Sequence, residues 1–176
     1  MSTDYVLHQF GDDPFNNFYK DPEGRAAFTI SPQAPNPNPV IRLTREAAWA
    51  QQHPSIMGPD NSYFYFGPEN KPGYLVYGNN KNSILMCYFW RQKREGSTSR
   101  YFITQSGREY KWRITDSQME CVDGHGRPLA RWELSDPEAD YHAQITIKPA
   151  GLTIITEILT TLVLNRMAQV LQWEPM

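Results

Sequence analysis

Residues 151–173 of this chain read GLTIITEILTTLVLNRMAQVLQW, with no proline and no glycine after the first position. A run of this length without a turn residue is too long for an ordinary strand and predicts a helix. Apolar residues occupy nearly every side of the helical wheel, and the only charges are Glu157 and Arg166. A helix that is apolar all round must be covered all round. The preceding chain supplies mostly strand-like segments, so we expect a curved β-sheet to cover it.

Two other structures for this segment remain open. A membrane-spanning helix needs about 20 predominantly apolar residues, whereas residues 152–164 already include Glu157 and four threonines, and no basic cluster follows. A pair of short strands would suit the many β-branched residues, but no turn residue divides the segment. We therefore predict a buried helix and no transmembrane span.

From residue 62 onward, short strand-like segments alternate with turn residues at the spacing typical of a sandwich or barrel. The expected strands are residues 63–66, 74–77, 84–91, 100–104, 109–114, 118–122, 129–134 and 142–147. In three of them, 109–114, 129–134 and 142–147, apolar and polar residues alternate, which predicts one buried and one solvent-facing side. Residues 84–90 are apolar throughout, so we expect them to be covered on both sides.

The N-terminal part carries weaker signals. Residues 5–10, 26–30 and 40–43 are expected strands, and residues 16–24 are expected to form a loop.

A proline tract and a short helix are also expected in this part. Residues 31–39 contain four prolines and predict an exposed loop. Residues 44–52 predict a short helix capped by Thr44, with Trp49 docking that helix onto the sheet.

Length and composition indicate a single domain spanning residues 1–176. The net charge of −2 gives no indication of a nucleic-acid binder. Cys87 and Cys121 have neither metal-ligand spacing nor a partner motif, and we expect both to be reduced. The first residues, MSTDYVLHQF, lack a basic region followed by an apolar run, so we expect no secretory signal and a cytoplasmic protein.

Two motifs and the helix that follows them carry a family resemblance. Residues 107–112 have the pattern Gly-x-x-Tyr-x-Trp, and residues 126–130 have the pattern Gly-x-Pro-x-Ala. Residues 154–167 then form an apolar, threonine-bearing segment that includes a basic residue. Over about residues 84–167 the chain resembles an uncharacterised fungal family of tubby-like C-terminal domains.

The wider relatives of that family include the tubby C-terminal domain, the plant LURP-one-related proteins and phospholipid scramblases. They share a barrel, so the resemblance implies a mainly β (α+β) fold: a tubby-like closed antiparallel β-barrel of about twelve strands around a buried C-terminal α-helix. The family has no assigned function. We expect no proline- and cysteine-rich leader before this domain and find no calcium-loop pattern in it, so scrambling activity is not implied.

The search for enzyme motifs finds no nucleophile elbow, phosphate-binding glycine loop, dinucleotide fingerprint or zinc-protease helix. The four histidines are scattered, and His125 lies in a glycine turn that is typical of a solvated side chain. The acidic residues of 12–23 are interpreted as a solvated loop rather than a cation site. We expect no catalytic residues, no cofactor and no metal, with an enzyme whose site is assembled only in the tertiary structure as the alternative.

Basic residues concentrate between positions 91 and 113, where the only acidic residues are Glu95 and Glu109. The basic residues are Arg91, Lys93, Arg94, Arg100, Arg108, Lys111 and Arg113. One interpretation is that these charges protect strand exteriors from edge pairing. The other, suggested by lipid binding in the tubby domain, is a basic barrel face that binds anionic phospholipid peripherally, or another phosphorylated ligand.

A third interpretation is a protein–protein interaction scaffold. It would use the proline loop, residues 31–39, or the aromatic hairpin, residues 63–77, to contact a partner protein.

Overall fold

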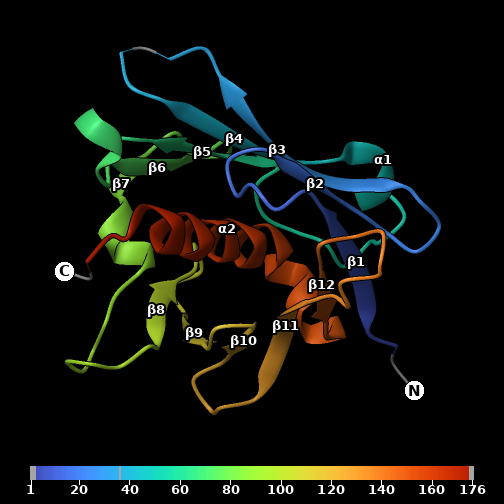
Figure 1. Cartoon of the computed structure of the whole chain (residues 1–176). Coiled ribbons are helices and arrows are strands. Elements are labelled where there is room, and N and C mark those ends of the chain that lie inside the picture. The colour runs from blue at the N-terminus through green and yellow to red at the C-terminus, as the bar shows by residue number, and fades with distance from the viewer. Residues whose placement is uncertain (1–2, 36, 175–176) are drawn as a thin grey trace.

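The computed structural model describes residues 3–35 and 37–174. Within them, twelve strands form one antiparallel sheet that curves around a C-terminal helix (Figure 1). The strands are β1 (Tyr5–Phe10), β2 (Asn17–Lys20), β3 (Ala26–Gln33), β4 (Val40–Arg45), β5 (Asn61–Tyr65), β6 (Tyr74–Tyr77), β7 (Ser83–Leu85), β8 (Arg100–Ile103), β9 (Glu109–Ile114), β10 (Gln118–Val122), β11 (Pro128–Leu134) and β12 (Ala143–Ile147). The helices are α1 (Ala47–Ala50) and α2 (Ile155–Leu171), and 3-10 turns cover Pro68–Asn70, Met86–Phe89 and Pro149–Ile154.

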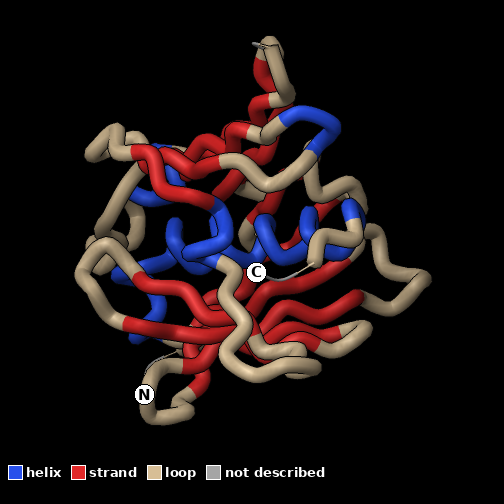
Figure 2. Tube along the Cα trace, turned by 90° about the vertical axis from the view of Figure 1, so that its left-hand side faces the viewer, coloured by secondary structure: helices blue, strands red, loops and turns tan. Residues whose placement is uncertain are grey.

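The strand order across the sheet is β7-β6-β5-β4-β3-β2-β1-β12-β11-β10-β9-β8. Neighbouring strands are consecutive in sequence everywhere except at β1 and β12, which pair through contacts such as Leu7 with Ile145. Figure 2 shows α2 in the middle of the molecule, with strands on both sides of it. The sheet is therefore a meander whose first and last strands meet, which leaves β7 and β8 as its edges.

The expectation of a closed barrel is corrected at these edges. In the described part of the chain no ladder joins β7 to β8, and the sheet is not closed by hydrogen bonds. The connection between them contains one bridge, in which the backbones of Arg91 and Tyr101 exchange hydrogen bonds of 3.0 and 2.7 Å. Met86, Phe89 and Trp90 of this connection are buried in the core, so side chains rather than a strand pair cover α2 at this seam.

The prediction of one strand over residues 84–91 is consequently wrong. Strand β7 ends at Leu85, and the chain continues as the 3-10 turn Met86–Phe89. A 3-10 turn directs successive side chains to different sides. Leu85 and Tyr88 are exposed while Met86 is buried, so this apolar run is not covered on both sides as expected.

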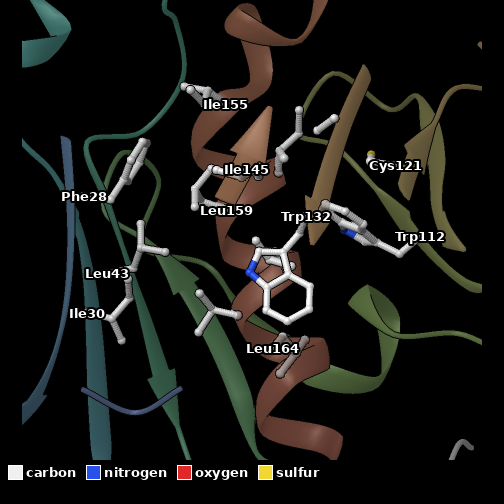
Figure 3. Packing of buried hydrophobic residues seen from close by; sticks show 14 of the residues in the cluster. Phe28, Ile30, Leu43, Trp112, Cys121, Trp132, Ile145, Ile155, Leu159 and Leu164 are labelled. Atoms are coloured by element: carbon white, nitrogen blue, oxygen red, sulfur yellow. The ribbon is translucent and has the colours of Figure 1, made fainter. Parts of the chain in front are cut away.

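The central helix is confirmed, with a shorter α-helical part than predicted. Residues 151–154 belong to the 3-10 turn, and α2 ends at Leu171, followed by Gln172 in the left-handed conformation. Thirteen of its seventeen residues are buried. In Figure 3 side chains from strands on both sides, among them Leu43, Trp112 and Trp132, point toward Leu159 and Leu164 of the helix.

The segment Pro149–Leu171 is the one helical stretch of the described chain that is long and apolar enough to cross a membrane. In this structure it is largely enclosed by the sheet, since 72% of its most apolar 18-residue window is buried. Core helices of soluble proteins pass the same test, so its length and composition decide nothing by themselves.

The polar residues of α2 are matched by polar groups on the sheet. The hydroxyls of Thr160 and Ser62 lie 2.9 Å apart. The indole nitrogen of Trp112 donates to Thr161 Oγ1 over 2.8 Å, and that hydroxyl donates in turn to the backbone oxygen of Glu157. Buried polar groups need such partners, and these hydrogen bonds explain how threonines occur inside an apolar core.

The N-terminal predictions are partly right. Helix α1 is Ala47–Ala50, shorter than expected, and Thr44 lies within β4 instead of capping it. Trp49 does dock α1 on the sheet, because it is buried with its ring 5.6 Å from that of Phe28.

Two segments expected to be loops are partly strand. Residues 17–20 of the expected 16–24 loop form β2. Strand β3 extends through Gln33, so the first three residues of the proline tract pair with β4. Position 36 of that tract lies outside the described residues.

Candidate anion-binding site

Four of the seven predicted basic residues lie on one side of the β8–β9 hairpin. In β9 the side chain of Trp112 is fully buried while Lys111 and Arg113 point away from the core, as the alternation predicts. Arg91 bridges to Tyr101, and Arg91 and Lys93 both pair with Glu109 of β9, which places these two side chains on the same side. The ammonium groups of Lys93 and Lys111 lie 4.2 and 5.6 Å from the centre of the Tyr101 ring, so this one ring contacts both lysines.

Carboxylates on the same surface neutralise part of this charge. Glu109 accepts hydrogen bonds from Lys93 and from Arg91, the latter over 2.9 Å, and these contacts hold the pKa of its carboxyl below the ordinary value. On the next strand Glu120 lies 3.6 Å from Arg113 and 3.4 Å from Arg131. The cross-strand register decides these pairs, because Arg113 and Arg131 both stand opposite Glu120.

The other three predicted residues are dispersed. Arg100 lies on the opposite side of β8, where its guanidinium donates to the carbonyl oxygens of Ser97 and Ser99 and lies 5.8 Å from the Trp90 ring. Arg94 is exposed in the connection before β8, and Arg108 is exposed in the β8–β9 turn at the other end of the hairpin. The seven residues therefore do not form one face.

Two contiguous grooves are lined by basic residues that only partly coincide with the seven predicted ones. They measure about 940 and 240 Å³ and share the lining residues Glu109, Tyr110, Asp123 and Gly124. We call their union the basic groove. Its basic lining residues are Lys93, Arg108, Lys111, Arg127 and Lys148, and its carboxylates are Glu109 and Asp123.

A tight turn shapes one wall of the basic groove. Asp123 Oδ1 accepts from the backbone N–H groups of His125 and Arg127, both over 2.9 Å, and its Oδ2 accepts from Arg127 Nε over 2.8 Å. These hydrogen bonds lower the pKa of the Asp123 carboxyl. Gly126 has a φ of +79°, a conformation that suits glycine and closes the turn.

The floor of the basic groove comes from the start of the central helix and from β9. Pro149, Ala150 and Thr153 of the 3-10 turn line it together with the half-buried Tyr110. Burial raises the pKa of the Tyr110 hydroxyl, so this group stays neutral and available as a hydrogen-bond donor. Lys148, which precedes the turn, pairs with Asp4 over 3.0 Å.

Among the described residues, the basic and histidine side chains of this groove that form no ion pair are Arg108, Lys111 and His125. Two fixed cations beside a neutral hydroxyl form a surface that attracts anions with several oxygens, such as phosphate groups. Within the same part of the chain no group of three or more His, Cys, Asp or Glu side chains is placed to hold a metal ion.

Comparison with protein-family models identifies the family of the chain. The model described as "Family of unknown function (DUF6593)" matches residues 12–168, which include every lining residue of the basic groove. The chain belongs to the DUF6593 family. No curated protein matches this DUF6593 chain.

Among solved structures, the X-ray structure of a protein from Arabidopsis thaliana is similar to this DUF6593 member. It shares 11% sequence identity, the match covers 96% of this chain and 92% of that one, and the TM-score is 0.46.

Sequence reasoning did not assign Arg127, His125 and Lys148 of the DUF6593 chain to this site. The glycine turn around His125 is visible in the sequence but is typical of a solvated side chain, and its proximity to Arg108 depends on how β9 and β10 pair. No local sequence pattern marks Lys148 as a groove residue. It follows the last residue of β12, and the pairing of β12 with β11 places it beside the groove.

Proposed function

We propose that this chain is a non-enzymatic binding domain that holds a phosphate-bearing anionic ligand in the basic groove. The observation that carries the proposal is the composition of the lining, five basic side chains against two carboxylates, in a chain of net charge −2. The ligand is the headgroup of an anionic phospholipid such as a phosphoinositide, or a soluble molecule with the same phosphate chemistry.

The resemblance to tubby-like domains supports the lipid source. We propose that the twelve-stranded sheet around α2 is a tubby-like arrangement, opened at the seam between β7 and β8, in a cytoplasmic protein. Binding would be peripheral, because α2 is enclosed by the sheet and lies within the hydrophobic core.

Electrostatic attraction determines the expected affinity for an anionic membrane. Each Lys or Arg near an anionic membrane contributes about 1 kcal/mol, so a few residues give weak association. Screening at physiological salt acts over about 8 Å, and raising the salt should release the protein.

The test is co-sedimentation with vesicles of neutral lipid alone or with 5% phosphoinositide. A double variant, Arg108→Glu with Lys111→Glu, reverses the two unpaired cations. Losing two such contributions corresponds to about 2 kcal/mol, or at least about a 30-fold weaker association. The matched control, Lys71→Glu with Lys81→Glu, changes the net charge equally at two exposed lysines outside the groove and should bind as the parent does.

A soluble inositol phosphate added as competitor separates the two ligand sources. If the headgroup chemistry alone is recognised, the competitor binds the parent protein and displaces it from vesicles. Equal sedimentation with neutral vesicles, or equal loss of binding in both double variants, would contradict the proposal of a specific groove.

A tyrosine ladder favours a second candidate function, that of a protein-interaction scaffold. On the outer side of β5 and β6 the ring centres of Tyr63 and Tyr65 lie 6.2 Å apart, and those of Tyr65 and Tyr74 lie 4.9 Å apart, both stacked. Exposed aromatic clusters are enriched at interfaces. Self-association is the form testable with the purified chain: the mass measured by light scattering should rise with concentration, and Tyr65→Ser should suppress that rise.

A further inference from the structure

A groove on the outer side of β5 and β6 is lined by three tyrosines. It measures about 460 Å³, within the size range of ligand pockets. No carboxylate among the described residues lines it. We call it the tyrosine groove, and its aromatic and polar side chains are those of Tyr63, Tyr65, Tyr74, Asn61, Lys81 and Ser83.

The strand register places the tyrosine groove beside the β3–β4 connection. The ring centre of Tyr65 lies 6.2 Å from that of Tyr63 and 4.9 Å from that of Tyr74. Tyr65 stands opposite Tyr74 on one side and opposite Val40 on the other. Val40 is the first residue of β4 and directly follows the proline loop, residues 31–39. The groove and the proline loop therefore lie at the same end of this part of the sheet.

The proline loop extends outward from the rest of the molecule. Figure 1 shows the connection between β3 and β4 projecting beyond the neighbouring strands, and Figure 2 shows the same projection after a quarter turn. Pro35, Pro37 and Pro39 are exposed, and the loop sequence SPQAPNPNP contains no charged residue. None of the described loop residues, 31–35 and 37–39, lines the tyrosine groove of its own chain. The loop is thus available to another molecule.

The chemistry of the tyrosine groove suits a proline-rich segment. Such segments bind aromatic-lined grooves, where their preformed backbone loses little conformational entropy. A tyrosine can contact proline in two ways, because its ring packs against the pyrrolidine and its hydroxyl donates to a backbone oxygen. In the described part of the chain no backbone N–H donates to the oxygens of Pro35 and Pro37, which leaves both as acceptors.

Other surfaces of the chain suit the tyrosine groove less well. The outer sides of β9, β10 and β11 carry the charged residues Arg113, Glu120 and Arg131. Burying such charges against tyrosine rings would remove their hydration, which costs free energy. The uncharged proline loop avoids this cost.

We propose that the tyrosine groove binds the proline loop of a second copy of this chain. The inference rests on the second function proposed above, self-association through the tyrosine ladder, and it names the segment that occupies the groove. Because loop and groove lie at the same end of the sheet, two copies related by a two-fold axis each insert a loop into the groove of the other. This exchange makes two equal contacts and closes the assembly as a dimer.

Two half-defective variants test the exchange. Tyr65→Ser removes the middle ring of the groove and keeps the loop, whereas Pro35→Ser with Pro37→Ser changes the loop and keeps the groove. Neither variant should associate with itself. The ¹⁵N-labelled loop variant should nevertheless bind unlabelled Tyr65→Ser protein, with saturable NMR shifts of the Tyr63 and Tyr74 backbone amides. The unlabelled loop variant should bind it at least tenfold more weakly. Equal shifts with both unlabelled proteins, or shifts with neither, would overturn the inference.

Matched controls change the same residue types elsewhere. Pro54→Ser with Pro137→Ser alters two exposed prolines outside the loop, and Tyr88→Ser alters an exposed tyrosine that does not line the groove. Both control proteins should dimerise as the parent does in sedimentation velocity. A control that loses dimerisation as completely as the loop variant would count against the exchange.

A synthetic peptide of residues 31–39 tests the contact on the unmodified protein. It should bind the tyrosine groove and compete with dimerisation, while the same peptide with serine at every proline should bind at least tenfold more weakly. If the parent self-associates through Tyr65 but the loop variant does so equally, the second proposed function stands and the loop is not the occupant. If the parent stays monomeric and the peptide does not bind, both proposals are wrong.

Discussion

Replacing Thr161 by valine removes one hydroxyl from the middle of α2 and changes little else in shape. In the structure that hydroxyl accepts the indole N–H of Trp112 over 2.8 Å, and Trp112 is fully buried. The variant therefore leaves a buried donor without an acceptor. Trp112→Phe removes the same donor, and the two changes together remove both partners.

The expected magnitudes follow from this hydrogen bond. An unsatisfied buried donor costs about 1–3 kcal/mol, so Thr161→Val should destabilise the parent protein by that amount. In the Trp112→Phe background no donor is left unsatisfied, and Thr161→Val should be nearly neutral. The coupling energy of the double-mutant cycle is therefore about 1–3 kcal/mol. Trp112→Phe also creates a cavity, but its cost occurs in both backgrounds and cancels.

Urea unfolding followed by far-ultraviolet circular dichroism measures the four proteins. With a slope of about 2 kcal/mol per molar urea, the coupling appears as a midpoint difference of about 1 M. Equal slopes in all four proteins are required for the comparison. A coupling energy below about 0.3 kcal/mol would show that Trp112 and Thr161 do not bond as the structure has it, and would refute the reasoning.

Two further predictions concern the helix start and the sheet. Burial raises the pKa of Glu157 above its ordinary value of 4.5. The folded protein therefore keeps that proton to a higher pH than the unfolded chain does, and it loses stability as the pH rises from about 4.5 to the raised pKa. Glu157→Gln should have a higher melting temperature than the parent at pH 8, with the difference vanishing near pH 4, and a lower melting temperature at pH 8 would contradict this. A methyl group at Gly73 would lie 1.9 Å from the backbone oxygen of Tyr65, whereas one at Gly124 would meet nothing within 4 Å. Gly73→Ala should therefore cost about 3 kcal/mol and Gly124→Ala less than about 0.5, as measured by urea unfolding, and equal costs would count against the packing described at Gly73.

Local sequence patterns were sufficient to predict the elements whose structure depends on neighbouring residues along the chain. The helix was predictable because residues 151–173 contain no proline and no internal glycine, a run too long for an ordinary strand, and its burial followed from apolar residues on every side. The alternation in β9 correctly placed Trp112 inside and Lys111 outside. Residues 84–91 misled the same reasoning, since an apolar run without alternation does not distinguish a strand from a 3-10 turn.

The candidate site was much less predictable. The sequence shows that basic residues concentrate between positions 91 and 113, but the local charge depends on which carboxylates stand opposite them. Arg100 and Arg108 are close in sequence yet lie at opposite ends of the hairpin, one at each end of α2.

What the sequence by itself determined is the central helix, most of the strands and the sides of those strands that face the core. These follow from residue spacing along one segment, which fixes where each side chain points once the local period is known. Only the tertiary structure decided the pairing of β1 with β12, the seam between β7 and β8, and the assembly of Arg108, Arg127 and Lys148 around one groove. Those features depend on strand register and on contacts between residues distant in sequence, and a one-residue change of register would exchange the two faces of a strand.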